Sequence, residues 1–272
     1  MQLTLAMRQL REAGFENPGL EARLLAEEAG DDRARFDALL ARLLAHEPMA
    51  YLLERRGFWT LELEVSPATL IPRPDSETLI EAALAAFPER DGVRSVLDLG
   101  TGTGCLLLAA LAEFRAAWGL GIDREQAAIA LAQRNARALG FAGRAHFACA
   151  DWAAPVGNEF DVVLCNPPYI ASGEIGALMP EVALFEPRTA LDGGVDGLAA
   201  YRELIPMVPA LLGAGGIAIF EVGQGQAAAV RELAVRSNLA VALRHDLGGI
   251  ARALVLRNPG REKAFGIRSA GG

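Results

Sequence analysis

The stretch 160-FDVVLCNPPYI-170 decides the fold of this 272-residue chain, because it runs from a buried strand into a rigid turn. The short, largely apolar run from Asp161 to Cys165 is typical of a strand buried in a parallel sheet. The strand must stop at Pro167 and Pro168, since neither has an N–H for the ladder and both fix φ at about −65°. Open α/β sheets bind ligands at the carboxyl ends of their strands, so we expect a site at this turn.

The turn offers two hydrogen-bond acceptors side by side, the Asn166 side-chain oxygen and the Pro167 backbone oxygen. Such a pair suits a planar –NH2 group, either an amide or an exocyclic base amine, and Tyr169 adds an aromatic wall. The alternative is an ordinary Asn-Pro turn, but a glycine-rich loop upstream favours a functional role. We therefore interpret Asn166, Pro167 and Tyr169 as catalytic residues, and the substrate grip as Asn166, Pro167, Pro168 and Tyr169.

The glycine-rich loop is 96-VLDLGTGTG-104, a strand that runs into a turn and then a helix. Glycine is needed where the backbone turns sharply and a ligand approaches it closely. The spacing is GxGxG rather than the GxGxxG of dinucleotide-binding proteins, since Cys105 stands in place of the third glycine, and this weakens the NAD interpretation. The predicted cofactor loop consists of Gly100, Thr101, Gly102, Thr103 and Gly104.

Two further strand ends carry groups that suit a nucleoside. Asp123 comes 19 residues after Gly104, where a carboxylate can bind unmodified ribose hydroxyls. Asp151 and Trp152 follow the next strand, where a carboxylate can face an adenine amino group and an indole can cover the ring. With Asn166 as a further contact, these residues predict a bound S-adenosylmethionine whose methyl group points at the gripped –NH2. Methyl transfer from a sulfonium needs positioning more than strong acid or base.

The composition excludes several other chemistries. The chain has a single lysine, Lys263, which rules out a Walker A lysine, a Schiff-base lysine and an SxxK nucleophile. The cysteines at 105, 149 and 165 are far apart, so no metal site or disulfide framework is indicated. A net charge of −8 gives no general footprint for nucleic acid. Without a signal peptide or a membrane-length apolar run, we expect a cytoplasmic protein with no membrane partner.

The first 56 residues carry apolar side chains at helical spacing, with Leu3 and Leu10 on one face. Asp31 or Asp32 can cap a later helix of this region. We expect these helices to be too small for a core of their own and to pack as a lobe on the rest of the protein. Because all the cofactor-type residues come later, the lobe is predicted to recognise a protein substrate.

Beyond the lobe, Phe58 to Ile71 is predicted to form a β-hairpin, and Pro72-Arg73-Pro74 a stiff connector. From Arg94 onward strands and helices alternate, which indicates a mainly parallel sheet with helices on both faces. The expected strands are Ser95–Leu99, Gly119–Asp123, His146–Ala150, Asp161–Cys165, Ile217–Val222, Val241–His245 and Leu254–Leu256. The expected helices between them include Gln126–Leu139, Gly197–Leu212 and Gln226–Ser237. The predicted organisation is a helical substrate-recognition lobe (1–56), a hairpin and linker (57–74), an S-adenosylmethionine-dependent methyltransferase domain (75–258) and a disordered tail (259–272).

With these residues in hand, the chain resembles the PrmC/HemK family of protein glutamine-N5 methyltransferases, which act on class-1 peptide release factors. The resemblance covers nearly the whole chain and is carried by EPMAYLLERRGFW (47–59), LIPRPDSE (70–77), the glycine loop, Asp151-Trp152, NPPYI and FEPRTALDGGVDGLAAYREL (185–204). It implies an α/β fold: a helical lobe, a hairpin and a Rossmann-like domain of seven strands, one of them antiparallel. It also implies methylation of the Gly-Gly-Gln glutamine that serves translation termination.

The resemblance assigns the cofactor to Gly100–Gly104, Asp123, Trp152 and Asn166, and the glutamine to Asn166–Tyr169. Two segments depart from the family: Asp75-Ser76 replaces the usual Glu-Thr, and 246-DLGGIARALVLR-257 lacks the usual acidic-Arg pair. By resemblance Glu186, Arg188 and Glu221 look important, although from the sequence each is equally consistent with a structural salt bridge.

Three other functions compete with this interpretation. A ribosomal-protein glutamine methyltransferase of the same family would use the same residues. A nucleic-acid amino methyltransferase would use the same turn on adenine or guanine, but it needs phosphate contacts that an acidic chain does not favour. A non-catalytic adenosine-binding scaffold would not need Asn166. We expect a monomer that binds class-1 release factors and makes no direct contact with nucleic acid.

Overall fold

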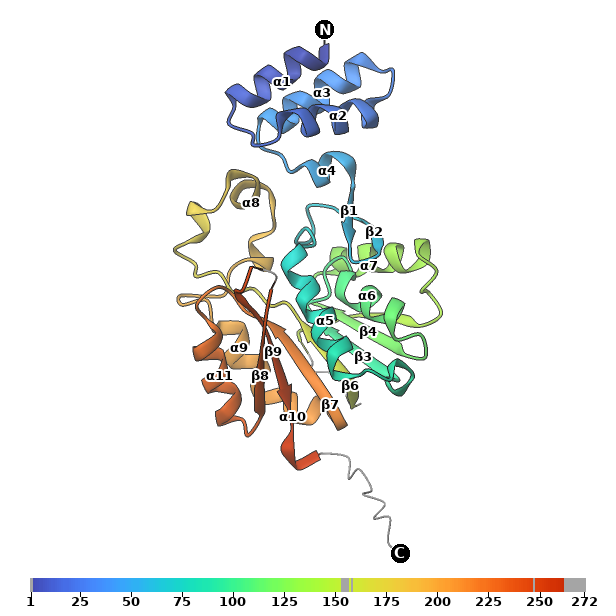
Figure 1. Ribbon diagram of the computed structural model, residues 1–272, viewed down its shortest axis with the longest axis vertical. Helices are drawn as coiled ribbons and strands as arrows, with labels where there is room; N and C mark the ends of the chain where they lie inside the picture. The colour runs from blue at the N-terminus through green and yellow to red at the C-terminus, as the bar shows by residue number, and fades with distance from the viewer. Residues whose placement is uncertain (1, 153–156, 158, 247, 262–272) are drawn as a thin grey trace, which may run out of the picture.

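The computed structural model describes residues 2–152, 157, 159–246 and 248–261. Figure 1 shows an α/β domain with a small helical lobe standing at one end of it, joined through α4 (Met49–Leu53) and a two-stranded hairpin. Within the described residues, no helix combines the length and the apolar character of a membrane span.

The α/β domain is built on a seven-stranded sheet with the order β5-β4-β3-β6-β7-β9-β8. The strands are β3 (Ser95–Leu99), β4 (Trp118–Asp123), β5 (Ala145–Cys149), β6 (Phe160–Cys165), β7 (Leu212–Glu221), β8 (Ala240–His245) and β9 (Ala251–Arg257). β9 runs antiparallel to both of its neighbours, and the remaining pairs are parallel. The predicted fold class is confirmed.

Successive side chains of the central strands point to opposite faces of the sheet and pack into two separate apolar cores, one on each face. Val96 packs under α5 (Glu77–Ala86), α6 (Cys105–Glu113) and α7 (Gln126–Ala138). Its neighbour Leu97 packs on the other face, against α9 (Ala199–Leu204), α10 (Val208–Leu211) and α11 (Ala227–Arg236). This sandwich holds the carboxyl ends of β3, β4, β5 and β6 at one edge.

Two predicted elements differ in extent. β7 begins at Leu212 rather than at Ile217, because the glycines between them hide the strand period; a Cβ on Gly216 would lie 2.6 Å from the Phe160 carbonyl oxygen. The expected helix from Gly197 to Leu212 is instead α9, a 3-10 turn and α10. Pro206 and Pro209 explain the break, since each removes an N–H from the helical ladder.

The lobe consists of α1 (Gln2–Glu12), α2 (Pro18–Ala29) and α3 (Arg33–Leu44) around a core of its own. The expectation that it has no such core was therefore wrong. Leu10 is fully buried, whereas Leu3 is 37% exposed and does not share its environment. Asp32 caps α3 by accepting a hydrogen bond from the Arg35 N–H, as predicted.

The hairpin occurs earlier than predicted, as β1 (Arg55–Phe58) and β2 (Leu61–Glu64). Its first strand reads Arg-Arg-Gly-Phe and shows no alternation, which explains the error. The residues from 65 to 73 form an irregular connector that leads into a 3-10 turn (Pro74–Ser76). At the other end of the chain, the first residues of the predicted tail form a 3-10 turn (Pro259–Arg261), while 262–272 lie outside the described residues.

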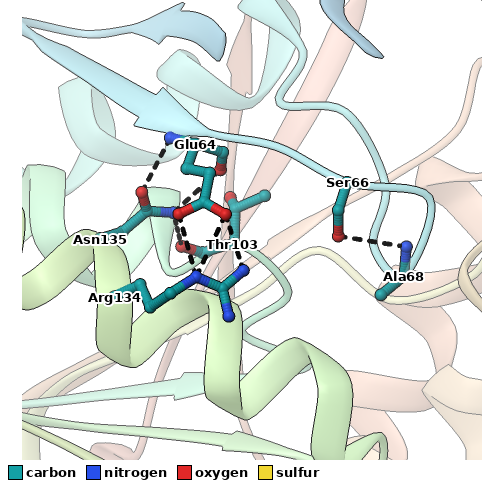
Figure 2. A network of polar contacts seen from close by, with 6 residues as sticks. All are labelled: Glu64, Ser66, Ala68, Thr103, Arg134 and Asn135. Atoms are coloured by element: carbon teal, nitrogen blue, oxygen red, sulfur yellow. Dashed lines mark hydrogen bonds and ion pairs between the residues drawn. The ribbon is translucent and has the colours of Figure 1, made fainter. Parts of the chain in front are cut away.

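A buried asparagine helps to tie the hairpin to the α/β domain. The Asn135 side chain on α7 accepts from the Glu64 N–H (2.8 Å) and donates to the carbonyl oxygens of Glu64 (3.0 Å) and Thr103 (2.9 Å). Arg134 adds a two-pronged ion pair with the Glu64 carboxylate. Figure 2 shows the two α7 side chains reaching up to the hairpin and across to the loop that contains Thr103. The end of the hairpin and the glycine loop are therefore held as one unit.

Candidate active site

A cavity lies at the carboxyl ends of the central strands and encloses about 970 Å³, including its open mouth. The irregular connector after the hairpin forms its opposite wall. The predicted site residues that line the cavity are Gly100, Thr101, Gly102, Thr103, Asp123, Asp151, Trp152, Asn166 and Pro168. Pro167 is buried and Tyr169 is half-buried, and neither lines the cavity. Gly104 does not line it either: with φ of 84° it begins α6.

The Asp123 carboxylate shapes the glycine loop as well as facing the cavity. One oxygen accepts from the Gly102 N–H and the other from the Glu125 N–H, each at 2.9 Å. Burial raises the pKa of this carboxyl, and the two backbone N–H groups lower it in turn. Each oxygen keeps a further lone pair, so Asp123 can still accept from a ligand's hydroxyl groups.

Asp98 on β3, two residues before the glycine loop, is a buried carboxylate that does not itself line the cavity. It is 1% exposed and accepts a hydrogen bond from the Thr101 hydroxyl at 2.6 Å, while its other oxygen has no partner among the described residues. Burial raises its pKa to about 7. Two hydroxyls of the cavity wall, on Thr69 and Thr103, also lack partners within the described structure. Buried polar atoms are rarely left unbonded, so the two hydroxyls of the cavity wall indicate a polar ligand.

Trp152 lies over the glycine loop. Its indole comes within 3.6 Å of the place that a Cβ on Gly100 would take. Its backbone φ of 45° is uncommon for a bulky residue, and such strain is concentrated at functional sites. The glycine thus leaves room for a flat surface of indole and backbone at the cavity, which suits an aromatic ring.

The turn after β6 is fixed by a chain of hydrogen bonds. The Asn166 Nδ2 donates to the Ser76 Oγ at 3.0 Å, and the Ser76 hydroxyl donates to Glu221 Oε2. The Tyr169 hydroxyl donates to Glu221 Oε1 at 3.1 Å, so Tyr169 is anchored beneath the turn. Because its nitrogen is engaged, Asn166 has its side-chain oxygen left to accept from a ligand.

Glu221 itself is 1% exposed, and burial raises its pKa to about 7. Among the described residues it forms no salt bridge, so the salt-bridge role left open by the sequence is not the one it has; its contacts are hydrogen bonds from Ser76 and Tyr169. The neighbouring Arg252 pairs instead with Asp75 (2.8 Å) and Asp246 (3.0 Å). The segment that departs from the family pattern thus still provides an acidic-Arg pair, between different positions.

Glu186 and Arg188 have structural contacts. The buried Glu186 carboxylate accepts from Arg73 and from the Ile71 N–H, and so fastens the segment after the turn to the connector wall. Burial raises its pKa, and Arg73 opposes that shift. Arg188 forms an ion pair with Asp192 at 3.1 Å on the surface.

Comparison with known proteins agrees with this geometry. Residues 76–191 match the methyltransferase small domain family. The chain is 46% identical over 267 residues to the release factor glutamine methyltransferase of Rhodospirillum rubrum, which covers 92% of this chain and 82% of that protein. The chain belongs to the release factor glutamine methyltransferase family. A second member, from Bradyrhizobium diazoefficiens, is 42% identical over 93% of this chain and 92% of its own length.

The family resemblance inferred from the sequence is thereby confirmed. A crystal structure of a methyltransferase from Pyrococcus furiosus superimposes with a TM-score of 0.53 at 17% identity, over 79% of this chain and 95% of that one. At that identity the likeness concerns the fold. A release factor glutamine methyltransferase with this architecture is an S-adenosylmethionine-dependent enzyme. Its cavity is lined by Gly100 to Thr103 and Asp123 and, from the turn after β6, by Asn166 and Pro168.

Proposed function

We propose that this enzyme transfers the methyl group of S-adenosylmethionine to the side-chain amide nitrogen, N5, of the glutamine in the Gly-Gly-Gln motif of class-1 peptide release factors. The observation that carries the proposal is the side-chain oxygen of Asn166, which accepts no hydrogen bond from the described residues and is held on a rigid turn at the wall of the cavity. The names of the relatives support the release factor as substrate.

The residues around the cavity suit S-adenosylmethionine. Asp123 would hold the ribose hydroxyls, the indole of Trp152 would cover the adenine ring, and Asp151 would face its amino group. The unpartnered oxygens of Asp98 and Thr103 would accept from the polar groups of the methionine portion. Bound there, the cofactor supplies an electrophilic methyl group on a sulfonium.

The Asn-Pro-Pro-Tyr turn would orient the substrate nitrogen. The Asn166 oxygen and the Pro167 carbonyl accept the two N–H groups of the glutamine amide and turn its nitrogen toward the methyl group. Positive charge develops on that nitrogen during transfer, and acceptors fixed beforehand stabilise it without rearrangement. Tyr169, anchored on Glu221, supports the wall of the grip.

The helical lobe would recognise the release factor as a protein. Every cofactor-type residue lies in the α/β domain, whereas the lobe has its own core and surface. A chain that starts at Arg55 should bind S-adenosylmethionine yet fail to methylate an intact release factor; full activity would remove this role from the lobe. We further propose a cytoplasmic monomer that makes no direct contact with nucleic acid.

Mass spectrometry of a release factor incubated with the enzyme and S-adenosylmethionine tests the proposal. One added methyl group should appear on the glutamine of the Gly-Gly-Gln motif, and none on a factor whose glutamine is replaced by alanine. Ribosomal proteins and a small RNA serve as competing substrates. Methylation of either of these, with the release factor left unmodified, would overturn the proposed substrate.

A further inference from the structure

An asparagine side chain has nearly the same shape in two orientations, which exchange its oxygen and its NH2 group. At Asn166 the difference is decisive, because an oxygen facing the cavity accepts from a glutamine –NH2 and an NH2 facing it repels that group. The two prolines fix the backbone of the turn but do not choose between the orientations. Something else in the structure must make the choice.

We propose that Glu221, acting through Ser76, is the positioning residue that sets the polarity of Asn166. This inference rests on the proposed function. It adds a reason why the site would prefer a glutamine amide to a carboxylate. Glu221 does not line the cavity, and Ser76, which does, has its hydroxyl engaged by Glu221 and Asn166. Both therefore act by deciding which atom of Asn166 faces the substrate.

The chemistry of the three groups explains the selection. An ionised carboxylate only accepts hydrogen bonds, so it takes the single proton of the Ser76 hydroxyl. Ser76 is then left with lone pairs alone and can only accept, which draws the Asn166 NH2 toward it at 3.0 Å. A flipped Asn166 would set its oxygen against those lone pairs and lose the hydrogen bond.

The surroundings make this chain of bonds rigid. Ser76 is 2% exposed, and the second Glu221 oxygen is occupied by the Tyr169 hydroxyl, so no water is needed to complete the chain. The Tyr201 hydroxyl donates to the Glu221 backbone carbonyl at 2.8 Å and fixes the end of β7. A threonine at position 76 would supply the same hydroxyl.

The test uses Ser76→Ala, which removes only the hydroxyl, and Glu221→Met, which removes the acceptor at similar size. Ser76→Thr is the conservative rescue. Ser95→Ala is the matched control, because Ser95 is another buried serine that donates to a carboxylate, that of Asp161 at 3.3 Å. Ser95 lies at the amino end of β3, and its loss should leave methylation unchanged.

The decisive readout is a preference and not a rate alone. Binding of a Gly-Gly-Gln release factor is compared with binding of its Gly-Gly-Glu counterpart, whose carboxylate suits a flipped, donating Asn166. Wild type, Ser76→Thr and Ser95→Ala should favour the glutamine form. Ser76→Ala and Glu221→Met should lose that preference and slow single-turnover methylation by about 10- to 100-fold, less than the roughly 10²- to 10³-fold expected when the preorganised contact itself is removed.

If the variants bound both release factors more weakly by the same factor, Glu221 and Ser76 would be ordinary structural residues and the inference would be overturned. An unchanged preference in Ser76→Ala would do the same, even if Glu221→Met failed to fold. If the wild type methylates no glutamine at all, the proposed function fails instead. The side-chain NH2 signals of Asn166 in ¹⁵N-labelled protein give a direct check, since they should shift in Ser76→Ala and stay in place in Ser95→Ala.

Discussion

Two buried carboxylates flank the central strand β6 and differ in one respect. Asp98 on β3 and Glu221 at the end of β7 are each 1% exposed, and burial raises the pKa of each to about 7. Both oxygens of Glu221 accept from hydroxyls of the protein itself, whereas one oxygen of Asp98 has no partner in the described structure. In the function proposed above, the acceptor half of the site is complete without a ligand, whereas the cofactor half is completed by a donor that reaches the open oxygen of Asp98.

This difference indicates that the two buried carboxylates have different roles. Burying a charge is unfavourable unless its hydrogen bonds are satisfied, so a complete set of partners makes Glu221 a fixed reference for the atoms around it. The incomplete set at Asp98 has the opposite consequence, since a ligand that donates there removes an existing penalty. Substitutions in the two halves should therefore have different signatures.

The largest effect is expected in the complete half, from Asn166→Ala. This change removes one acceptor at the substrate nitrogen and should slow single-turnover methylation of a release factor by about 10²- to 10³-fold. Affinity for S-adenosylmethionine should fall much less, because Asn166 is one contact among several. A rate within about threefold of wild type would show that the turn is structural and that the proposed grip is wrong.

Asn166→Asp sharpens the same test. It retains an acceptor but adds a negative charge beside a cationic cofactor. Ground-state affinity for S-adenosylmethionine should rise while the methylation rate stays low, because tighter binding of the ground state does not accelerate transfer. Calorimetric titration and single-turnover kinetics on the same preparation separate the two quantities; a restored rate would contradict the account.

In the open half, Asp98→Asn should weaken S-adenosylmethionine binding by roughly 10- to 100-fold, as expected for a lost charge-assisted hydrogen bond. Asparagine can still accept from Thr101, but its NH2 opposes a donating ligand. Stability should not fall, because a buried and unsatisfied carboxylate has been removed. Calorimetric titration measures the affinity and thermal unfolding measures the stability. A loss of stability with unchanged affinity would show that Asp98 has a structural role and is not open to the cofactor.

Asp123→Ala should cost a similar or smaller factor, about 1.5–3 kcal/mol of binding free energy. The structure adds a consequence: the N–H groups of Gly102 and Glu125 lose their acceptor, so the loop should loosen locally while the fold persists. Titration with S-adenosylmethionine measures the first effect, and amide hydrogen exchange at the loop measures the second. Unchanged affinity would remove Asp123 from the site.

The smallest effect is the pH dependence. The pKa of Glu221 is raised to about 7, chiefly by burial; Asp75 also raises it and Arg252 opposes the shift. As pH falls below about 7 the carboxylate gains a proton and no longer only accepts, so methylation at saturating cofactor should decline several-fold toward pH 6. Stability should move the other way, because the folded state then binds more protons than the unfolded chain. Glu221→Met should flatten the decline in rate.

Much of the fold was predictable because periodicity reports burial directly. The strand Ser95–Leu99 occurs as predicted, and Gly100 to Thr103, Asp123 and Asn166 converge on one cavity. The lobe's core was missed because helical spacing shows which face of a helix is apolar and not what that face meets. Asp98 was missed because a carboxylate inside an apolar strand looks like part of the strand.

The remaining omissions concern hydrogen bonds between distant segments. Ser76 lies 145 residues from Glu221, and no local pattern joins a connector serine to the end of a later strand. Asn135 likewise reaches the hairpin from a helix 71 residues downstream. Such pairs come together only in the folded chain, so the sequence alone does not identify them.

The separate core of the helical lobe has a consequence for how the chain is made. Its contacts are local in sequence, so the lobe can collapse as soon as about 55 residues have left the ribosome. The sheet cannot do so, because β9, synthesised last, is inserted between β7 and β8 and contributes Leu254 and Leu256 to a central core. A folded lobe is therefore expected before the α/β domain can complete its sheet, so a substitution that damages β8 or β9 would leave the lobe folded beside an unfinished domain.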